Sequence, residues 1–339
     1  MNKADQGRWL AGKLWMLLLL PWLVGGCVLL PGSGYDKQPL TIQTLNLFNQ
    51  RIPSSMARKN WKGDWLFRRD RIELVDAELR SSKPDILMLQ GAMERDGSAS
   101  ESDVRILARG ALEGYAWDTK EVATWRDTGE LENMAVAVGL PVRVVSVGSA
   151  STSIRRFGGN GQVVFSDLSL DQTPVLIFNV RMPDGAVRPE AFRSLAKFIR
   201  QKVREKASCL KRVIVGGTMP SSMTVDSTRV MVSSLQLRDV SDGYCEVESD
   251  CFTGSPINEI FMVTQGDASP SRMDRIYIHQ SGKVLSSAAV FNTPRTINRY
   301  ASTYGISRLW PSRRFGWGGT IRLASCTEED REQMRGTSP

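Results

Sequence analysis

The chain has 339 residues, of which 41% are hydrophobic and 24% are charged, and this composition is typical of a globular protein and excludes a disordered one. Its formal charge of +8 favours anionic partners, but no run of five or more like charges is present, so nucleic acid is not expected as a partner. The chain has a single histidine, His279. That count excludes sites that need two imidazoles, including His-rich zinc centres and the HExxH motif of metalloproteases.

Residues 1–26 have the pattern of an export signal peptide. A basic segment over 1–13 is followed by eleven apolar residues over 14–24, LWMLLLLPWLV. This apolar run is shorter than the ~20 residues that a membrane-spanning helix needs. A basic start, a short apolar run and then two glycines predict a segment that is removed on export. Its removal would leave a charge of +6, because the segment holds three basic residues and one acid.

The sequence Leu-Val-Gly-Gly-Cys at 23–27 resembles the bacterial lipobox. The resemblance implies that Cys27 is diacylated, becomes the mature N-terminus and attaches residues 27–38 to a membrane as a tether. Val28 replaces the aspartate that retains lipoproteins in the inner membrane of enteric bacteria. We therefore expect a lipid-anchored protein of the cell envelope, on the outer membrane and facing the periplasm. The alternative is ordinary cleavage nearby, with Cys27 unmodified.

Four cysteines remain after Cys27: Cys209, Cys245, Cys251 and Cys326. An even number in an exported chain predicts two disulfides, for which three pairings are possible. A bond between Cys245 and Cys251 would close a tight loop, and a bond between Cys209 and Cys326 would tie the end of the chain to its interior. The alternative is four buried thiols.

The mature chain alternates predicted strands and helices. Apolar residues alternate with polar ones over 39–46, and a helical apolar face recurs over 66–82 until Pro84. A second amphipathic helix begins at Pro189. Further strands are predicted at 85–90, at two segments on either side of 139–141, and at 163–170, 174–180, 212–217, 273–279 and 318–325. The pattern predicts one four-layer α/β domain over 39–325, with two packed sheets and outer helices, and a frayed polar tail over 326–339.

The order of several segments resembles the DNase-I-like endonuclease/exonuclease/phosphatase superfamily, and the resemblance runs from about residue 40 to 325. It is carried by TLN at 44–46, PDILMLQ at 84–90, NMAVAVGLP at 133–141, VLIFNVR at 175–181, VIVGGTMP at 213–220, MDRIYI at 273–278 and PSRRFGWGGTIRL at 311–323. The resemblance implies a four-layer sandwich of two mainly antiparallel sheets flanked by helices. It also implies hydrolysis of phosphate esters by Mg²⁺-binding carboxylates, a water-activating Asp and two His that stabilise phosphate oxygens.

The first family positions are kept only in part. Asn46 matches the Asn of the opening strand. Gln90 matches the middle of the Leu-Gln-Glu motif, but Gly91 stands where that motif has its metal-binding Glu. Arg181 stands at the His of the Asn-x-His motif. Asp274 is kept, and its family counterpart orients a catalytic His.

The remaining catalytic positions are lost. Thr218 and Pro220 replace the Asp and the Asn of the Gly-Asp-x-Asn motif, and Arg313 and Arg314 replace the Asp and the His of the Ser-Asp-His motif. His279 matches no catalytic position. Two acids, Glu94 and Asp226, could replace lost ligands, but neither lies at the expected strand end. The family's activity therefore does not carry over residue by residue, and we expect no metal and no cofactor.

The replacements predict a cluster of guanidinium groups if the strand ends converge. Arginine cannot act as a general base, but it binds carboxylate or phosphate through paired hydrogen bonds. The predicted anion-binding or relict site comprises Asn46, Gln90, Arg181, Asp274, Arg313 and Arg314. Alternatively, Arg314 pairs with Asp274 and replaces the metal internally.

The leading hypothesis is an envelope pseudoenzyme that binds an anionic, phosphate-bearing small molecule or a protein partner. One alternative is an active phosphodiesterase with relocated ligands, and another is a structural scaffold without a ligand. An open basic cavity would favour the anion-binding hypothesis. Acids that converge on one point would favour the active enzyme, and a filled site would favour the structural scaffold. A partner would contact loops at 95–130 and 285–312. Trp125, Trp310 and Trp317 are candidate contact residues, although burial in the core is the commoner role of tryptophan.

Overall fold

The computed structural model describes residues 34–47, 68–94, 102–124, 131–140, 142–144, 151–153, 161–170, 172–182, 189–220, 226–245, 251–255, 257–258, 271–296, 307–312 and 314–336. The predicted signal peptide, Cys27, Trp125 and Arg313 lie outside these residues, so the predictions made for them stay predictions. Within the described part of the chain, no helix is both long enough and apolar enough to cross a membrane.

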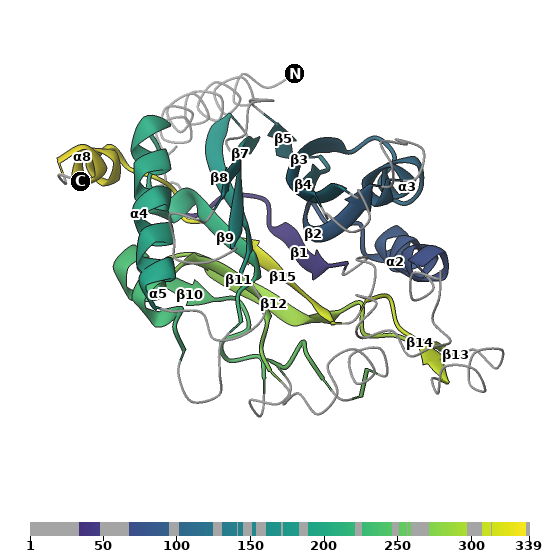
Figure 1. Cartoon of the computed structure of the whole chain (residues 1–339). Helices are drawn as coiled ribbons and strands as arrows, with labels where there is room; N and C mark the ends of the chain where they lie inside the picture. The colour runs from purple at the N-terminus through teal and green to yellow at the C-terminus, as the bar shows by residue number, and fades with distance from the viewer. Residues whose placement is uncertain are drawn as a thin grey trace, which may run out of the picture.

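Two mixed β-sheets pack face to face (Figure 1). The first sheet has the order β12 (Lys283–Val290), β15 (Gly316–Arg322), β1 (Leu40–Asn46), β2 (Ile86–Glu94), β4 (Leu131–Val138), β3 (Ala116–Thr124). The second has the order β10 (Leu237–Asp239), β11 (Asp274–His279), β9 (Val213–Thr218), β8 (Thr173–Arg181), β7 (Gln162–Leu170), β5 (Val142–Val144), with β6 (Ser151–Ser153) also beside β7. Each sheet has one parallel pair among these strands, β1 with β2 and β8 with β9, and the other pairs are antiparallel. The predicted fold class is confirmed.

Helices cover the outer face of each sheet (Figure 1). The first sheet is covered by α2 (Arg68–Ser82) and α3 (Asp103–Arg109), and the second by α4 (Pro189–Glu205) and α5 (Arg229–Leu235). A 3-10 turn, η3 (Leu210–Arg212), leads into β9, and β13 (Arg295–Thr296) pairs with β14 (Arg308–Leu309). The chain ends in α8 (Glu328–Gly336) beside α4.

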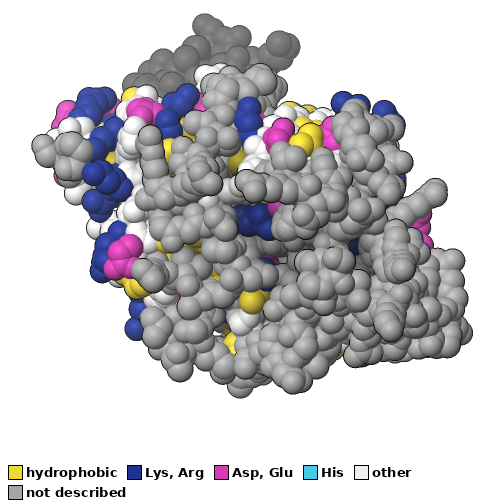
Figure 2. Space-filling model, viewed as in Figure 1, with side chains coloured by type: hydrophobic (Ala, Val, Ile, Leu, Met, Phe, Trp, Pro, Cys, Tyr) yellow, Lys and Arg dark blue, Asp and Glu magenta, His cyan; other side chains and the backbone are white. Residues whose placement is uncertain are grey.

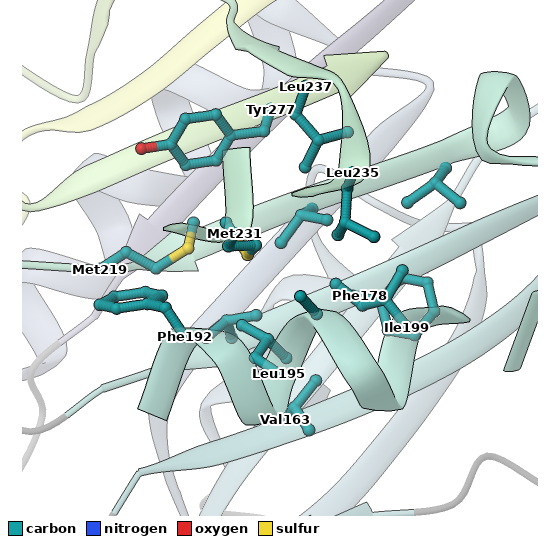
Figure 3. Close-up of a cluster of buried hydrophobic side chains, with 14 of the residues drawn as sticks. Val163, Phe178, Phe192, Leu195, Ile199, Met219, Met231, Leu235, Leu237 and Tyr277 are labelled. Atoms are coloured by element: carbon teal, nitrogen blue, oxygen red, sulfur yellow. The ribbon is translucent and has the colours of Figure 1, made fainter. Parts of the chain in front are cut away.

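Three apolar clusters hold the layers together. The cluster between the sheets includes Ile42, Ile86, Ile214 and Ile276, all fully buried, and these residues come from β1, β2, β9 and β11. A second cluster fills the space beneath α2 and α3. The third lies under α4, where the apolar face predicted from the sequence meets the second sheet (Figure 3). Because each β-strand shows one face to the inter-sheet core and the other to a helix, its burial is nearly continuous.

Several details differ from the sequence-based predictions. The strands on either side of 139–141 belong to different sheets, because β4 pairs in the first sheet and β5 in the second. The expected partner loops are partly regular structure, since α3 and β3 lie within 95–130 and most of β12 lies within 285–312. Trp310 and Trp317 are buried, as their commoner role implies. The frayed tail is wrong for 328–336, which form α8.

The four cysteines form two disulfides, which selects one of the three possible pairings. Cys209 bonds to Cys326, with Cα atoms 6.1 Å apart, and Cys245 bonds to Cys251, with Cα atoms 5.8 Å apart. The first disulfide joins η3 to the segment before α8, and the second closes the short loop after β10.

Candidate functional site

Four strands bring the predicted positions to one edge of the sandwich. β1 ends at Asn46, β8 at Arg181 and β9 at Thr218, while β11 begins at Asp274. In the second sheet Thr218 lies opposite Arg181 on one side and opposite Asp274 on the other. In the first sheet Asn46 lies opposite Gln90. The convergence that the sequence required is therefore present.

A hydrogen-bond chain joins the two kept family positions through Thr218. Asn46 Nδ2 donates to Thr218 Oγ1 at 3.0 Å, and Thr218 Oγ1 donates to Asp274 Oδ1 at 2.9 Å. The exposed fractions of the three side chains are 6%, 0% and 1%. Thr218, where the resemblance led us to expect an Asp, therefore links the two sheets directly through a neutral hydroxyl.

Gln90 and Asn179 form a second buried link between the sheets. Gln90 Nε2 donates to Asn179 Oδ1 at 2.6 Å and to Thr44 Oγ1 at 3.1 Å. Asn179 Nδ2 donates to the carbonyl oxygens of Leu89 and Ala135 at 2.9 and 3.0 Å. Both amides are fully buried. Gln90 therefore serves to clamp the sheets and is not presented to a ligand.

Gly91 has a backbone conformation that disfavours the glutamate it replaces. Its φ is +62°, in the left-handed region, and the pairing of β2 with β4 shifts register between Leu89 and Ala92. Such a bulge with a positive φ is a position where glycine is preferred over residues that carry a Cβ. The loss of the carboxylate is thus accompanied by a backbone that fits glycine.

Arg181 is neutralised by an acid that the sequence analysis did not single out. Its Nη1 lies 2.6 Å from Glu132 Oε1, and the side chain of Glu132 is fully buried whereas that of Arg181 is 23% exposed. Glu132 lies near the start of β4, two residues before the run Met134–Val138. An acid next to a fully buried apolar strand was the available signal, because a buried carboxylate requires a partner.

Ser312 and Arg314, from the last of the segments that carry the resemblance, are buried, and Ser312 contacts the end of β1. Ser312 Oγ donates to the carbonyl oxygen of Asn46 at 2.5 Å, and Asn258 Nδ2 donates to the carbonyl oxygen of Ser312 at 2.8 Å. The side chain of Arg314 is 1% exposed. Thr253 connects this segment to β11, because its carbonyl accepts from the N–H of Phe315 and its hydroxyl oxygen accepts from the N–H of Asp274.

The other candidate residues lie apart from this network or add no ligand. Pro220 is buried just beyond β9, and Glu94 is the last residue of β2, opposite Leu131. Asp226 bonds to Arg275 at 3.2 Å. Burial tends to raise the pKa of Asp226, but the charge of Arg275 and the hydrogen bonds from Thr228 outweigh it and lower the pKa. Asp226 is therefore held as part of an ion pair just before the start of α5.

The described part of the edge has balanced charge and no cluster of acidic ligands. Arg181 and Arg314 are matched in formal charge by Glu132 and Asp274. Among the described residues, the one group of three His, Cys, Asp or Glu ligand atoms within 4.8 Å of one another is Cys209, Cys326 and Asp330. Two of these atoms form a disulfide, so the group does not provide three free metal ligands.

Comparison with known proteins identifies the fold. No protein-family model matches the chain, and no curated protein matches it. Among solved structures, an endonuclease/exonuclease/phosphatase family protein from Bacteroides thetaiotaomicron superposes with a TM-score of 0.59 at 16% identity, over 84% of this chain and 99% of that one. A mannosyl-6-phosphatase from the same organism gives 0.58 at 16% identity, over 83% and 99%. Truncated TDP2 from Caenorhabditis elegans gives 0.55 at 17% identity, over 84% and 98%.

These likenesses extend over nearly the whole length of the solved proteins. The chain therefore has the DNase-I-like fold of the endonuclease/exonuclease/phosphatase superfamily. At this level of identity the likeness defines the fold, and the chemistry of the site has to be argued from the residues of this chain.

Proposed function

We propose that this chain is a non-catalytic protein on a phosphoesterase fold, tethered to the bacterial cell envelope, that works by binding a partner. The observation that carries the proposal is the chain from Asn46 through Thr218 to Asp274. In a metal-dependent hydrolase this edge needs several oxygen ligands directed at one point. Here the hydroxyl and amide groups are directed at one another.

The residues at Thr218, Arg181 and Arg314 support the same conclusion, because none of them can accept a proton from water. Hydrolysis requires a group that accepts a proton from water, and neither threonine nor arginine provides one near neutral pH. Glu132 is the additional carboxylate at this edge, and it is held by Arg181 at 2.6 Å. This ion pair already engages the Glu132 carboxylate, which is fully buried, so it is not directed at a substrate water.

The structure favours a protein partner over a phosphate-bearing ligand at this edge. A phosphate bound by Arg181 would have to share the guanidinium with Glu132, which is buried and negative. Placing a dianion beside a buried carboxylate is costly because like charges repel in a low-dielectric environment. The receptor hypothesis thus requires the Arg181–Glu132 pair to open, whereas the partner-binding hypothesis leaves the pair intact.

The envelope location rests on residues 1–27. The basic start, the apolar run and the cysteine after Gly-Gly support acylation at Cys27. Globomycin, which blocks lipoprotein signal cleavage, should cause the uncleaved precursor to accumulate in the native host. A Cys27→Ser variant should lose incorporation of labelled palmitate. Cleavage that globomycin does not affect, together with palmitate incorporation that Cys27→Ser does not change, would contradict the lipid anchor.

The proposed lack of catalysis is tested with the full-length protein in the presence of added divalent metals. We expect no hydrolysis of single- or double-stranded DNA, bis-p-nitrophenyl phosphate or mannose 6-phosphate with Mg²⁺ or Mn²⁺. We also expect 10 mM Mg²⁺ to leave the thermal midpoint unchanged. A site with a Kd of about 0.1 mM would stabilise the fold by about 2.7 kcal/mol at that concentration. Metal-dependent turnover that disappears in an Asp274→Asn variant would overturn the proposal.

A further inference from the structure

A pocket lies at the opposite end of β11 from the candidate site. β11 begins at Asp274 and ends at His279, so the two ends are roughly 16 Å apart at ~3.3 Å per residue. The pocket has a volume of about 160 Å³ and is bounded by residues of α4, η3, α5 and α8. One water molecule needs only ~10–15 Å³ of such space, so a small ligand fits.

The pocket retains a positive charge. Lys211 Nζ lies 2.8 Å from Asp330 Oδ2, and Asp330 also accepts from the backbone N–H and the hydroxyl of Thr327. These two charges therefore offset one another. Arg200 also lines the pocket, and within the described part of the chain its one hydrogen bond is to the carbonyl oxygen of Ser234. A guanidinium has five N–H donors, so Arg200 has both a net charge and donors to offer.

A neutral polar wall faces these cations. The N–H of Ser281 donates to His279 Nδ1 at 3.2 Å, so the imidazole proton is placed on Nε2, which lies 3.3 Å from Gln236 Oε1. Burial and the charge of Lys211 lower the pKa of His279, and Asp330 opposes them in part. The imidazole thus adds no positive charge near neutral pH, and a bound anion would favour its protonation.

We propose that this pocket binds a small oxyanion, a carboxylate or phosphate group, held by Arg200 beside the Lys211–Asp330 pair and against the wall of His279 and Gln236. Arg200 supplies a planar fork of donors suited to two oxygens. Lys and Arg side chains lie among Asp and Glu side chains on the surface over α4 and α8 (Figure 2), so the positive charge offered to the anion comes from Arg200. This site is independent of the edge that contains Asn46 and Asp274.

The pocket exists only while α8 is docked. Met334 of α8 is buried and lines the pocket together with Cys209, and its carbonyl oxygen accepts from Arg204 Nε at 3.0 Å. The disulfide between Cys209 and Cys326 joins this helix to η3. We therefore expect anion binding to require the oxidised protein.

The single histidine allows a direct test. In the oxidised full-length protein one imidazole Cε1–H signal reports on the pocket in a ¹H–¹³C NMR spectrum. Titration with inorganic phosphate and, separately, with succinate should shift this signal with saturation and raise the pKa of His279. Sodium chloride at matched ionic strength is the reference. Saturation by phosphate alone indicates a phosphate-bearing ligand, and saturation by succinate alone indicates a carboxylate.

Substitutions of Arg200 test its role in binding the anion. Arg200→Gln should weaken binding at least tenfold, and Arg200→Lys should weaken it less. Arg193→Gln is the matched control, because Arg193 is an exposed residue of the same helix that pairs with Glu190. Folding of each variant is verified by far-UV circular dichroism. No saturable shift beyond that of sodium chloride with either anion, or unchanged affinity in both Arg200 variants, would overturn the proposal.

Discussion

Glu132 and Arg181 lie at the same edge as the kept Asn46 and Asp274, and they determine its electrostatic character. The carboxylate is fully buried and the guanidinium is 23% exposed, so the pair is asymmetric. A buried carboxylate loses most of its hydration, and one close guanidinium compensates for this loss. The edge is therefore electrically balanced among the described residues, although most of the replacements expected from the sequence were towards positive charge.

Arg181→Ala should destabilise the protein strongly, because it leaves a buried carboxylate without its guanidinium. We expect the free energy of unfolding in urea to fall by roughly 3 kcal/mol. The double variant Glu132→Gln with Arg181→Met should recover most of this loss, since it removes both charges. If the single variants Glu132→Gln and Arg181→Met and the double variant form an additive cycle, the ion pair does not contribute as described.

His279 should give the protein a pH dependence above the range of the carboxylates. Burial first, and then Lys211, lower its pKa from the ordinary value of 6.5. Because protonation is then easier in the unfolded chain, stability should be fully present above pH 6.5 and fall as the pH drops below it, by at most ~1.4 kcal/mol per unit. Urea unfolding between pH 8 and 5 measures the effect. The His279→Gln variant should lose the imidazole's part of this dependence, since no other histidine is present.

At the scale of elements, α8 shows how a polar segment becomes ordered. Its sequence, EEDREQMRG, offers little apolar surface, but Met334 is buried and Asp330 pairs with Lys211. Thr327 caps its first turn through hydrogen bonds exchanged with Asp330. Tertiary contacts rather than helix propensity therefore keep this segment in place.

The two disulfides should contribute unequally to stability. The bond between Cys209 and Cys326 spans 117 positions of sequence, whereas the bond between Cys245 and Cys251 spans six. Loop-closure entropy predicts losses of roughly 5 and roughly 2 kcal/mol when the respective pair is replaced by serine. Guanidinium unfolding of the two double variants tests the order. Equal losses would show that the longer bond does not act by restricting the unfolded chain.

At the scale of the molecule, the two sheets share one buried cluster that comes from both halves of the chain. Ile42 and Ile86 lie in the first sheet, and Ile214 and Ile276 in the second. Neither sheet can bury its inner face alone, because each provides the apolar surface that covers the other. The described sandwich should therefore unfold as one unit.

Ile214→Ala should lower the free energy of unfolding by roughly 3 kcal/mol while the transition stays single. Near- and far-UV circular dichroism should give the same midpoint in the wild type and in the variant. Leu285→Ala is the control, because its side chain is 46% exposed and should change stability by less than about 0.5 kcal/mol. Separate midpoints for the two signals would show that the sheets unfold independently.

Much of the fold and part of the candidate site could be predicted from the sequence. Alternation over 39–46 corresponds to β1, and the periodic apolar residues after Pro189 correspond to α4. The order of the motifs indicated the sandwich and the convergence of Asn46, Thr218 and Asp274. These predictions succeed because they depend on local periodicity and on the order of segments, both of which are written along the chain.

The partners of the side chains were decided by the tertiary structure. Asn46 and Thr218 are 172 positions apart, and their hydrogen bond exists because two sheets pack at a particular distance and angle. Glu132 meets Arg181 for the same reason. Periodicity shows which face of a strand a residue occupies, but only packing shows what lies opposite that face. The sequence by itself thus indicated the architecture and predicted that the hydrolytic residues are absent. The structure determined which side chains meet at the candidate site, through the hydrogen bonds of Thr218 with Asn46 and Asp274 and the ion pair of Arg181 with Glu132.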